Sequence, residues 1–153
     1  MIIAAHTAAG GFVGRAVNPD TGLQWTLTIF LAAGSHIILD FLPQIGYTFT
    51  PLLRTIDLGA AVIVLFIMMK IASNKKAVMV VGAAAAAPDI EHLLVEYTGI
   101  MERRVFISHL EGFPRMELSW QAGLIVETGV IVLAVAGIYF LEKRKARRKY
   151  KLL

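Results

Sequence analysis

Long apolar stretches separated by short polar connectors dominate the hydrophobic pattern of this chain. Four of them, at about 23–42, 56–72, 77–97 and 121–141, are long enough to cross a bilayer core, which needs roughly 17–25 residues of helix. A fifth stretch, residues 1–17, is shorter and contains His6 and several glycines. It lacks the positively charged start of a signal peptide, so we predict a helix of the mature protein.

The connectors have the composition of turns between helices. Residues 18–22 read Asn-Pro-Asp-Thr-Gly, a cluster of helix breakers, and residues 73–76 form a tight polar link. The pattern therefore predicts an all-α, polytopic membrane bundle of about five transmembrane helices over residues 1–142. A basic cytoplasmic tail is expected at 143–153.

Composition supports the membrane class. The chain is 57% hydrophobic and 17% charged, whereas a soluble domain carries about 25% charged residues. It has no cysteine, which excludes a disulfide framework, a thiolate metal site and a thiol nucleophile.

The net charge of +4 is concentrated in the tail, where seven of the nine residues 143–151 are Lys or Arg. Such a run directly after an apolar segment is typical of an anchor for anionic lipid headgroups, and we favour this over nucleic-acid binding. In a five-helix topology one side of the membrane receives eleven Lys and Arg residues and the other side four. This bias predicts the N-terminus outside and the C-terminus inside.

Ionisable residues within the apolar stretches are the candidate functional residues, because each costs several kcal/mol in a bilayer unless it has a partner. At a helical rise of about 1.5 Å per residue, they all fall within about 12 Å of the outer surface. They are His6, His36, Asp40, Asp57, Asp89, His92 and Glu127. We therefore predict that separate helices contribute them to one polar layer.

Spacing within the helices points to metal binding. His36 and Asp40 are four residues apart, and Asp89 and His92 are three apart, so each pair shares one helix face. Two such pairs on facing helices are how helical bundles build metal sites. Imidazole and carboxylate without sulfur predict a divalent ion, with zinc preferred and manganese or iron as alternatives.

Several of these residues have a second interpretation. Asp57 is equally typical of a first-turn carboxylate that a helix dipole favours, and His6 of a polar group in helix packing. Glu127 could act as a general base or as an interhelical hydrogen-bond partner. Glu91, close to Asp89, is the other candidate base. His109, in the outer connector, could close over the metal or be a surface histidine.

Three short motifs add a family resemblance: Ala5-His6-Thr7, Gly34-Ser35-His36-Ile37-Ile38-Leu39-Asp40 and Ala87-Pro88-Asp89-Ile90-Glu91-His92. They resemble motifs of bacterial and archaeal membrane-bound metal-dependent hydrolases. The resemblance implies His6, His36, Asp40, Asp89 and His92 as metal-site residues, with Glu91 in place of the family's second aspartate. It also implies a multi-pass protein of the prokaryotic plasma (inner) membrane.

These observations favour a metal-dependent hydrolase whose site lies in the outer leaflet, where a lipid or lipid-linked phosphoester could enter from the membrane. A non-catalytic membrane subunit, in which the polar layer stabilises the bundle or binds a partner, is the alternative. A b-type haem between two histidines is disfavoured because the neighbouring carboxylates suit a hard cation better. A transporter is disfavoured because five short segments leave little room for alternating access.

Overall fold

A computed structural model of the chain describes residues 2–45, 50–98, 100, 103, 105–106, 108, 113–114 and 116–150. The elements in chain order are α1 (Ile3–Val17), α2 (Gly22–Asp40), β1 (Gln44–Ile45), α3 (Pro51–Ile71), α4 (Lys75–Leu93), the π-helical turn η1 (Leu94–Thr98), β2 (Glu117–Leu118) and α5 (Trp120–Tyr150). The predicted all-α class is confirmed. The two short strands form one parallel pair, with Gln44 opposite Glu117, which ties the connector after α2 to the start of α5.

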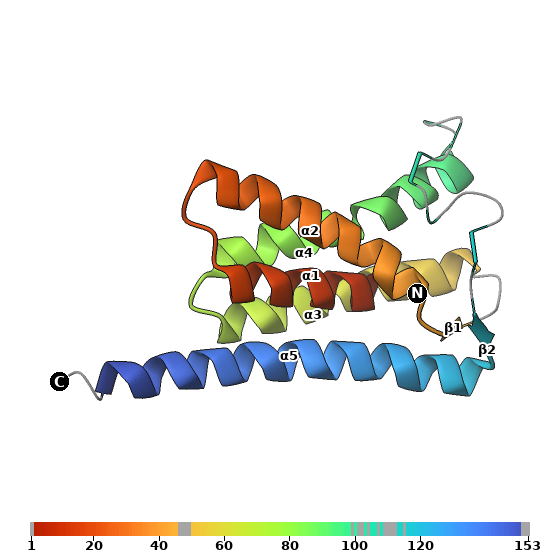
Figure 1. Cartoon of the computed structure of the whole chain (residues 1–153). Helices are drawn as coiled ribbons and strands as arrows, with labels where there is room; N and C mark the ends of the chain where they lie inside the picture. Colours follow the sequence, from red (N-terminus) through yellow and green to blue (C-terminus); the bar gives the residue numbers. More distant parts are fainter. Residues whose placement is uncertain are drawn as a thin grey trace.

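The helices alternate in direction, and α1 lies at the centre (Figure 1). Helices α1, α3 and α5 begin at the end of the bundle where α2 and α4 finish. Helix α1 contacts each of the other four helices, and most of its side chains are buried. Residues near the start of α1 therefore come level with the last turns of α2 and α4.

Local sequence signals explain where the helices begin and end. Helix α1 stops at Asn18, which adopts the left-handed conformation at φ 52° that asparagine tolerates well. Helix α2 starts with a capping box between Thr21 and Gln24. Asn74 caps α4 by accepting from the Ala77 N–H. Its amide also donates to the Asn18 side chain, which links the start of α4 to the end of α1. The predicted turns at 18–22 and 73–76 are thus built from capping side chains.

Glycine allows α1 to pack closely against α4. A Cβ on Gly10 would overlap the Ala85 side chain and lie 2.7 Å from the carbonyl oxygen of Val81. A Cβ on Gly14 would lie 2.8 Å from the Val81 Cβ. Small residues four apart are the usual means by which membrane helices approach closely. This contact fixes the position of α1 against α4, and it therefore matters for the polar groups that both helices carry.

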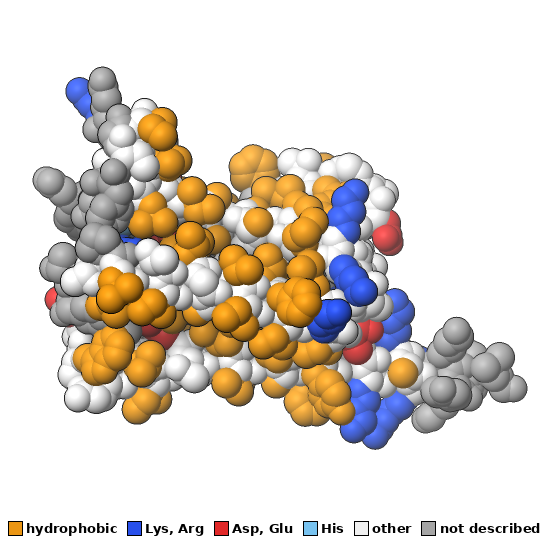
Figure 2. All heavy atoms as spheres, turned by 180° about the vertical axis from the view of Figure 1, so that it is seen from behind, with side chains coloured by type: hydrophobic (Ala, Val, Ile, Leu, Met, Phe, Trp, Pro, Cys, Tyr) orange, Lys and Arg blue, Asp and Glu red, His pale blue; other side chains and the backbone are white. Residues whose placement is uncertain are grey.

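Three described helices are long and apolar enough to cross a membrane: Gly22–Asp40, Leu52–Ile71 and Trp120–Arg148. Their outward faces carry large exposed apolar side chains, including Phe30, Ile63 and Leu133. Figure 2 shows apolar side chains spread over one broad face of the bundle. These features suit a lipid environment. Helices α1 and α4 instead supply most of the buried core.

The end of the bundle away from the start of α1 carries many basic side chains. Figure 2 shows Lys and Arg side chains gathered there. Arg15 of α1 is buried and pairs with Glu142 of α5, and Glu142 also accepts from the Ser73 N–H at 2.7 Å. Helix α5 continues to Tyr150, so the basic residues expected in a tail are helical as far as the structure describes them.

Candidate functional site

Four of the predicted ligands meet at the end of the bundle where α1 begins. His6 comes from α1, His36 and Asp40 from α2, and Asp89 from α4. His6 Nε2 lies 3.3 Å from Asp40 Oδ1 and 4.0 Å from Asp89 Oδ2, and His36 Nε2 lies 3.3 Å from Asp40 Oδ2 and 3.8 Å from Asp89 Oδ1. All four are buried, at most 5% exposed. Three helices thus place two imidazoles and two carboxylates around one point.

The two imidazole rings lie parallel to each other. The ring centroids of His6 and His36 are 3.6 Å apart, with an angle of 16° between the planes. Both rings point Nε2 at the same carboxylate, that of Asp40. Because the two rings stack, the Nε2 atoms of His6 and His36 lie side by side and approach Asp40 from the same direction.

The orientation of His36 is set by the backbone of α4. Its Nδ1 lies 3.0 Å from the carbonyl oxygen of Ala85, and a carbonyl can only accept, so Nδ1 carries the proton and donates. Nε2 is then the ring nitrogen that faces the carboxylates of Asp40 and Asp89. A hydrogen bond from the second ring nitrogen to a carbonyl is the usual support of a metal-bound histidine.

The contact between His36 and Ala85 lies in the turn of α4 that precedes Pro88. Pro88 lies inside α4, three residues after Ala85, and the helix continues through it to Leu93. Proline has no N–H, so the carbonyl that lacks its helical donor is that of Ala84, four residues before Pro88. The contact of His36 with Ala85 is made to the next carbonyl along the helix.

The spacing of the donor atoms fits a divalent ion. Ligands bonded to zinc at about 2.0–2.1 Å in a tetrahedron lie about 3.4 Å from one another. The four measured contacts between imidazole nitrogens and carboxylate oxygens are 3.3–4.0 Å. Ligand atoms of His6, His36 and Asp89 all lie within 4.8 Å of one another. Asp40 is not in this group of three, although its two oxygens each lie 3.3 Å from one histidine nitrogen. Asp40 would therefore have to shift to become a fourth ligand, and an ion held by both carboxylates would offset their charges.

Asp57 and His92, also predicted as ligands, make other contacts. The carboxylate of Asp57 accepts the N–H groups of Ile3 at 2.8 Å and Ala4 at 3.2 Å, and so caps the first turn of α1. His92 Nε2 lies 3.1 Å from an Arg54 nitrogen, which donates to it. Neither belongs to the group of described residues whose ligand atoms converge. Asp57 is thus a carboxylate at the N-terminus of a helix, where the helix dipole favours it. The helix that it caps is α1, however, and not α3, to which it belongs.

Glu91 binds the backbone of two described residues between η1 and α5, Val105 and Phe106. Its carboxylate accepts from the backbone N–H groups of Val105 and Phe106. The Phe106 ring in turn stands edge-on to the His36 ring, with 5.2 Å between centroids. Glu91 therefore anchors Phe106 beside His36, which makes Glu91 a poorer candidate for the general base.

Glu127 is buried, 1% exposed, in the first third of α5. It lies one turn before Ile131, which packs against Ile3 and Ala4 of α1. Glu127 is thus at the same end of the bundle as the cluster.

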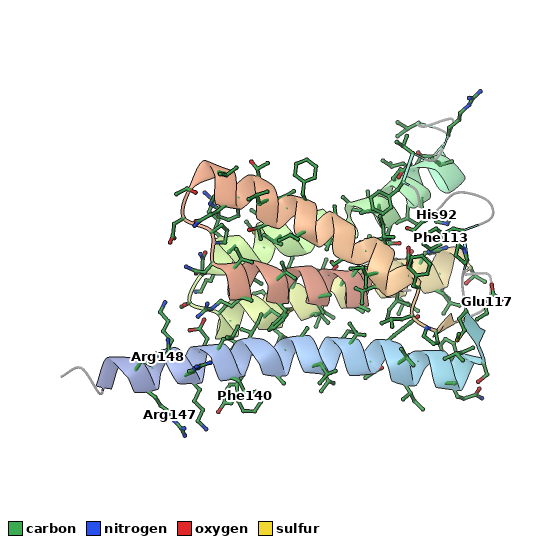
Figure 3. The ribbon with its side chains drawn as sticks, viewed as in Figure 1. His92, Phe113, Glu117, Phe140, Arg147 and Arg148 are labelled. Atoms are coloured by element: carbon green, nitrogen blue, oxygen red, sulfur yellow. The ribbon has the colours of Figure 1, made fainter. Side chains whose placement is uncertain are left out.

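His109, the last predicted ligand, lies outside the described residues. Figure 3 shows His92 at this end of the molecule, with Arg147 and Arg148 at the other.

Sequence reasoning did not find three contributors to the site. The Ala85 carbonyl carries no sequence signal of its own, although Pro88 in a helical segment hints at a disturbed backbone nearby. Arg54 was counted only as a charge for membrane orientation, and it meets His92. Phe106 reaches His36 only because the connector folds back over the bundle.

Comparison with known proteins adds no assignment. No family model matches the chain, and no curated protein and no solved structure gives a significant match to it.

Proposed function

We propose that this chain is an integral-membrane, metal-dependent hydrolase whose ion is held by His6, His36, Asp40 and Asp89. The observation that carries the proposal is the convergence of these four buried side chains from three helices. Two buried carboxylates side by side are costly unless a cation compensates them. Zinc is the preferred ion, with manganese or iron as alternatives, since the donors are nitrogen and oxygen without sulfur.

The proposed roles follow from the contacts. His36, with its proton fixed on Nδ1 by the Ala85 carbonyl, presents Nε2 to the ion. His6 presents Nε2 beside it, and Asp40 and Asp89 supply the oxygen ligands. When bound, a divalent ion supplies polarisation of an ester and activation of water near neutral pH.

Proton transfer is assigned to Glu127, because Glu91 already accepts two backbone N–H groups. Glu127 is buried at the same end of the bundle as the cluster, and a carboxylate is one of the side chains that serve as a general base. Phe106, held by Glu91, shields the histidines from water on one side.

The proposed membrane topology has five crossings, with the metal site towards the outside and the basic end in the cytoplasm of a prokaryotic cell. It is supported by three helices of sufficient length and hydropathy. It is also supported by the many Lys and Arg side chains gathered at one end of the bundle, where Arg147 and Arg148 lie, whereas His92 lies at the other end (Figures 2 and 3). A site at this depth suits a lipid or lipid-linked phosphoester as substrate.

The test is metal analysis of the purified native protein by mass spectrometry, together with phosphoester hydrolysis in detergent micelles. About one divalent ion per chain is expected, lost in His36→Ala and Asp89→Asn together with hydrolysis. His92→Ala is the matched control, because His92 contacts Arg54, and it should keep the ion. No bound divalent ion in the native protein would overturn the proposal.

A second candidate is a non-catalytic membrane subunit in which the cluster only joins helices. The observation that favours it is that Asp40 already pairs with both histidines, as a structural network would. In that case His36→Ala would lower the thermal stability of a protein that contains no metal.

A further inference from the structure

A pocket of about 410 Å³ opens between α3 and the end of α4, beside the metal-site end of the bundle. Its walls are mainly apolar, from Leu58 of α3 and from Ile90, Leu93 and Leu94 of α4 and η1. Polar residues lie at one end: Arg54 and Thr55 in the first turns of α3, and Thr98 at the close of η1. Its volume is in the usual range of roughly 300–1,000 Å³ for ligand sites.

Polarity changes with depth along this pocket. Arg54 is one helical turn before Leu58, so Leu58 lies about 6 Å further into the bundle. Thr98 is likewise one turn beyond Leu94 on the other wall. Leu58 and Ile90 are about two-fifths exposed, at 41% and 42%, so the pocket opens on the apolar outer face of the bundle. A ligand that fits must be charged at the surface level and apolar below it.

Arg54 is the charged group of the lining. Its guanidinium stays positive at any ordinary pH and offers five N–H donors in a fork that matches phosphate. One nitrogen donates to His92 Nε2 at 3.1 Å, which holds the fork in place. Thr98 already donates its hydroxyl to the Leu94 carbonyl at 2.7 Å, so it cannot also donate to a ligand. Arg54 is the only charged residue among the described lining residues of this pocket, so we assign recognition of an anion to its guanidinium.

We propose that this pocket binds the phosphate of a membrane phospholipid on Arg54 and one of its acyl chains between Leu58, Ile90 and Leu93. Charge complementarity selects the phosphate, and the apolar walls select a lipid over a water-soluble phosphate. The opening towards the bilayer lets the lipid enter sideways, without leaving the membrane.

The pocket lies next to the proposed metal centre. Arg54 binds His92, and His92 is three residues after Asp89 on α4, a rise of about 4.5 Å. A phosphate on Arg54 would thus lie about one helical turn above the carboxylate that faces His36. That this lipid is also the substrate rests on the proposed hydrolase function, whereas its binding does not require the metal.

The experiment is native mass spectrometry of the purified chain in detergent, titrated with phosphatidylglycerol and with diacylglycerol of identical acyl chains. Wild type should retain phosphatidylglycerol at least about tenfold better, since a charge-assisted hydrogen bond is worth about that factor or more. Arg54→Gln should lose the preference, and Arg54→Lys should keep part of it. Arg103→Gln is the matched control, because Arg103 is an exposed arginine of the outer connector, and it should behave as wild type.

A second variant tests the acyl site. Leu93→Trp fills the pocket and should lower retention of both lipids, with the melting temperature recorded to verify folding. Equal retention of the two lipids by wild type, an equal loss in Arg103→Gln, or full displacement of the phospholipid by millimolar inorganic phosphate would each overturn the proposal. His36→Ala separates the two hypotheses. Wild-type protein that holds no divalent ion but still retains phosphatidylglycerol contradicts the hydrolase and supports the lipid site. His36→Ala should lose the ion and keep the lipid preference. Loss of the preference for phosphatidylglycerol only in His36→Ala, with Arg54→Gln unchanged, contradicts the lipid site.

Discussion

His36 Nδ1 donates to the carbonyl oxygen of Ala85 across 3.0 Å, and so connects α2 to α4 three residues before Pro88, which lies inside α4. The contact leaves Nε2 of His36 directed at Asp40 and Asp89. A backbone carbonyl thus decides which nitrogen of the histidine faces the carboxylates. The same contact would fix the tautomer needed for metal binding.

Asp40→Asn is expected to weaken zinc binding strongly. Asp40 lies 3.3 Å from Nε2 of both His6 and His36, and an amide removes the negative charge that compensates the ion. The loss should be at least 10–100-fold, about the effect of losing even an outer-shell partner. Competition with a zinc chelator measures it. Asp20→Asn, an exposed carboxylate in the connector after α1, should bind zinc as wild type does.

Added metal is expected to stabilise the folded protein. At a zinc concentration about a hundredfold above Kd, binding adds about 2.7 kcal/mol to the free energy of unfolding, which raises the melting temperature. The rise should disappear after chelation and be absent in His36→Ala. A similar zinc-dependent rise in His36→Ala would show that the stabilising ion binds elsewhere.

Asp57→Asn is expected to destabilise α1 without emptying the metal site. Both oxygens of Asp57 accept N–H groups at the start of α1, and an asparagine retains only one acceptor oxygen. The cost should be about 1 kcal/mol, as for other lost helix caps. Melting temperature and metal content of the same preparation measure the two effects. Loss of the ion from a folded Asp57→Asn protein would instead assign Asp57 to the metal.

Gly10→Val is expected to be strongly destabilising. Any side chain at Gly10 meets Ala85 and the Val81 carbonyl, so α1 must move away from α4, at a cost of about 1–3 kcal/mol or more. Because His6 is four residues before Gly10 on the same helix, zinc affinity should fall as well. Gly34→Val is the matched control. A Cβ there meets nothing within 4 Å, and a melting temperature lowered as much as in Gly10→Val would contradict the packing argument.

Arg15→Ala is expected to cost about 1–3 kcal/mol, because it removes a charge-assisted hydrogen bond from the partly exposed Glu142. The double variant Arg15→Ala, Glu142→Ala should cost less than the sum of the two single variants. Chemical unfolding in mild detergent gives the three values. Lys145→Ala removes an exposed contact with Ser73 and should change stability by less than about 0.5 kcal/mol.

The sequence alone determined the helices, their direction and the level of the polar residues. Hydropathy and turn residues are local properties, so the connectors at 18–22 and 73–76 predicted the alternation of the helices, which places His6, Asp40 and Asp89 at one end. The helical rise then fixed the depth of each side chain. Nothing in this reasoning required knowledge of a neighbouring helix.

Only the tertiary structure decided which of the residues at that depth face one another. Helix rotation is set by packing between helices, here by Gly10 and Gly14 against α4, and spacing within one helix does not encode it. This is why His6 meets Asp40 and His36 meets Asp89, whereas Asp57 caps α1 and His92 meets Arg54. The level of a residue along the bundle can be counted along its own helix. The residues that it faces depend on how that helix packs against the other helices.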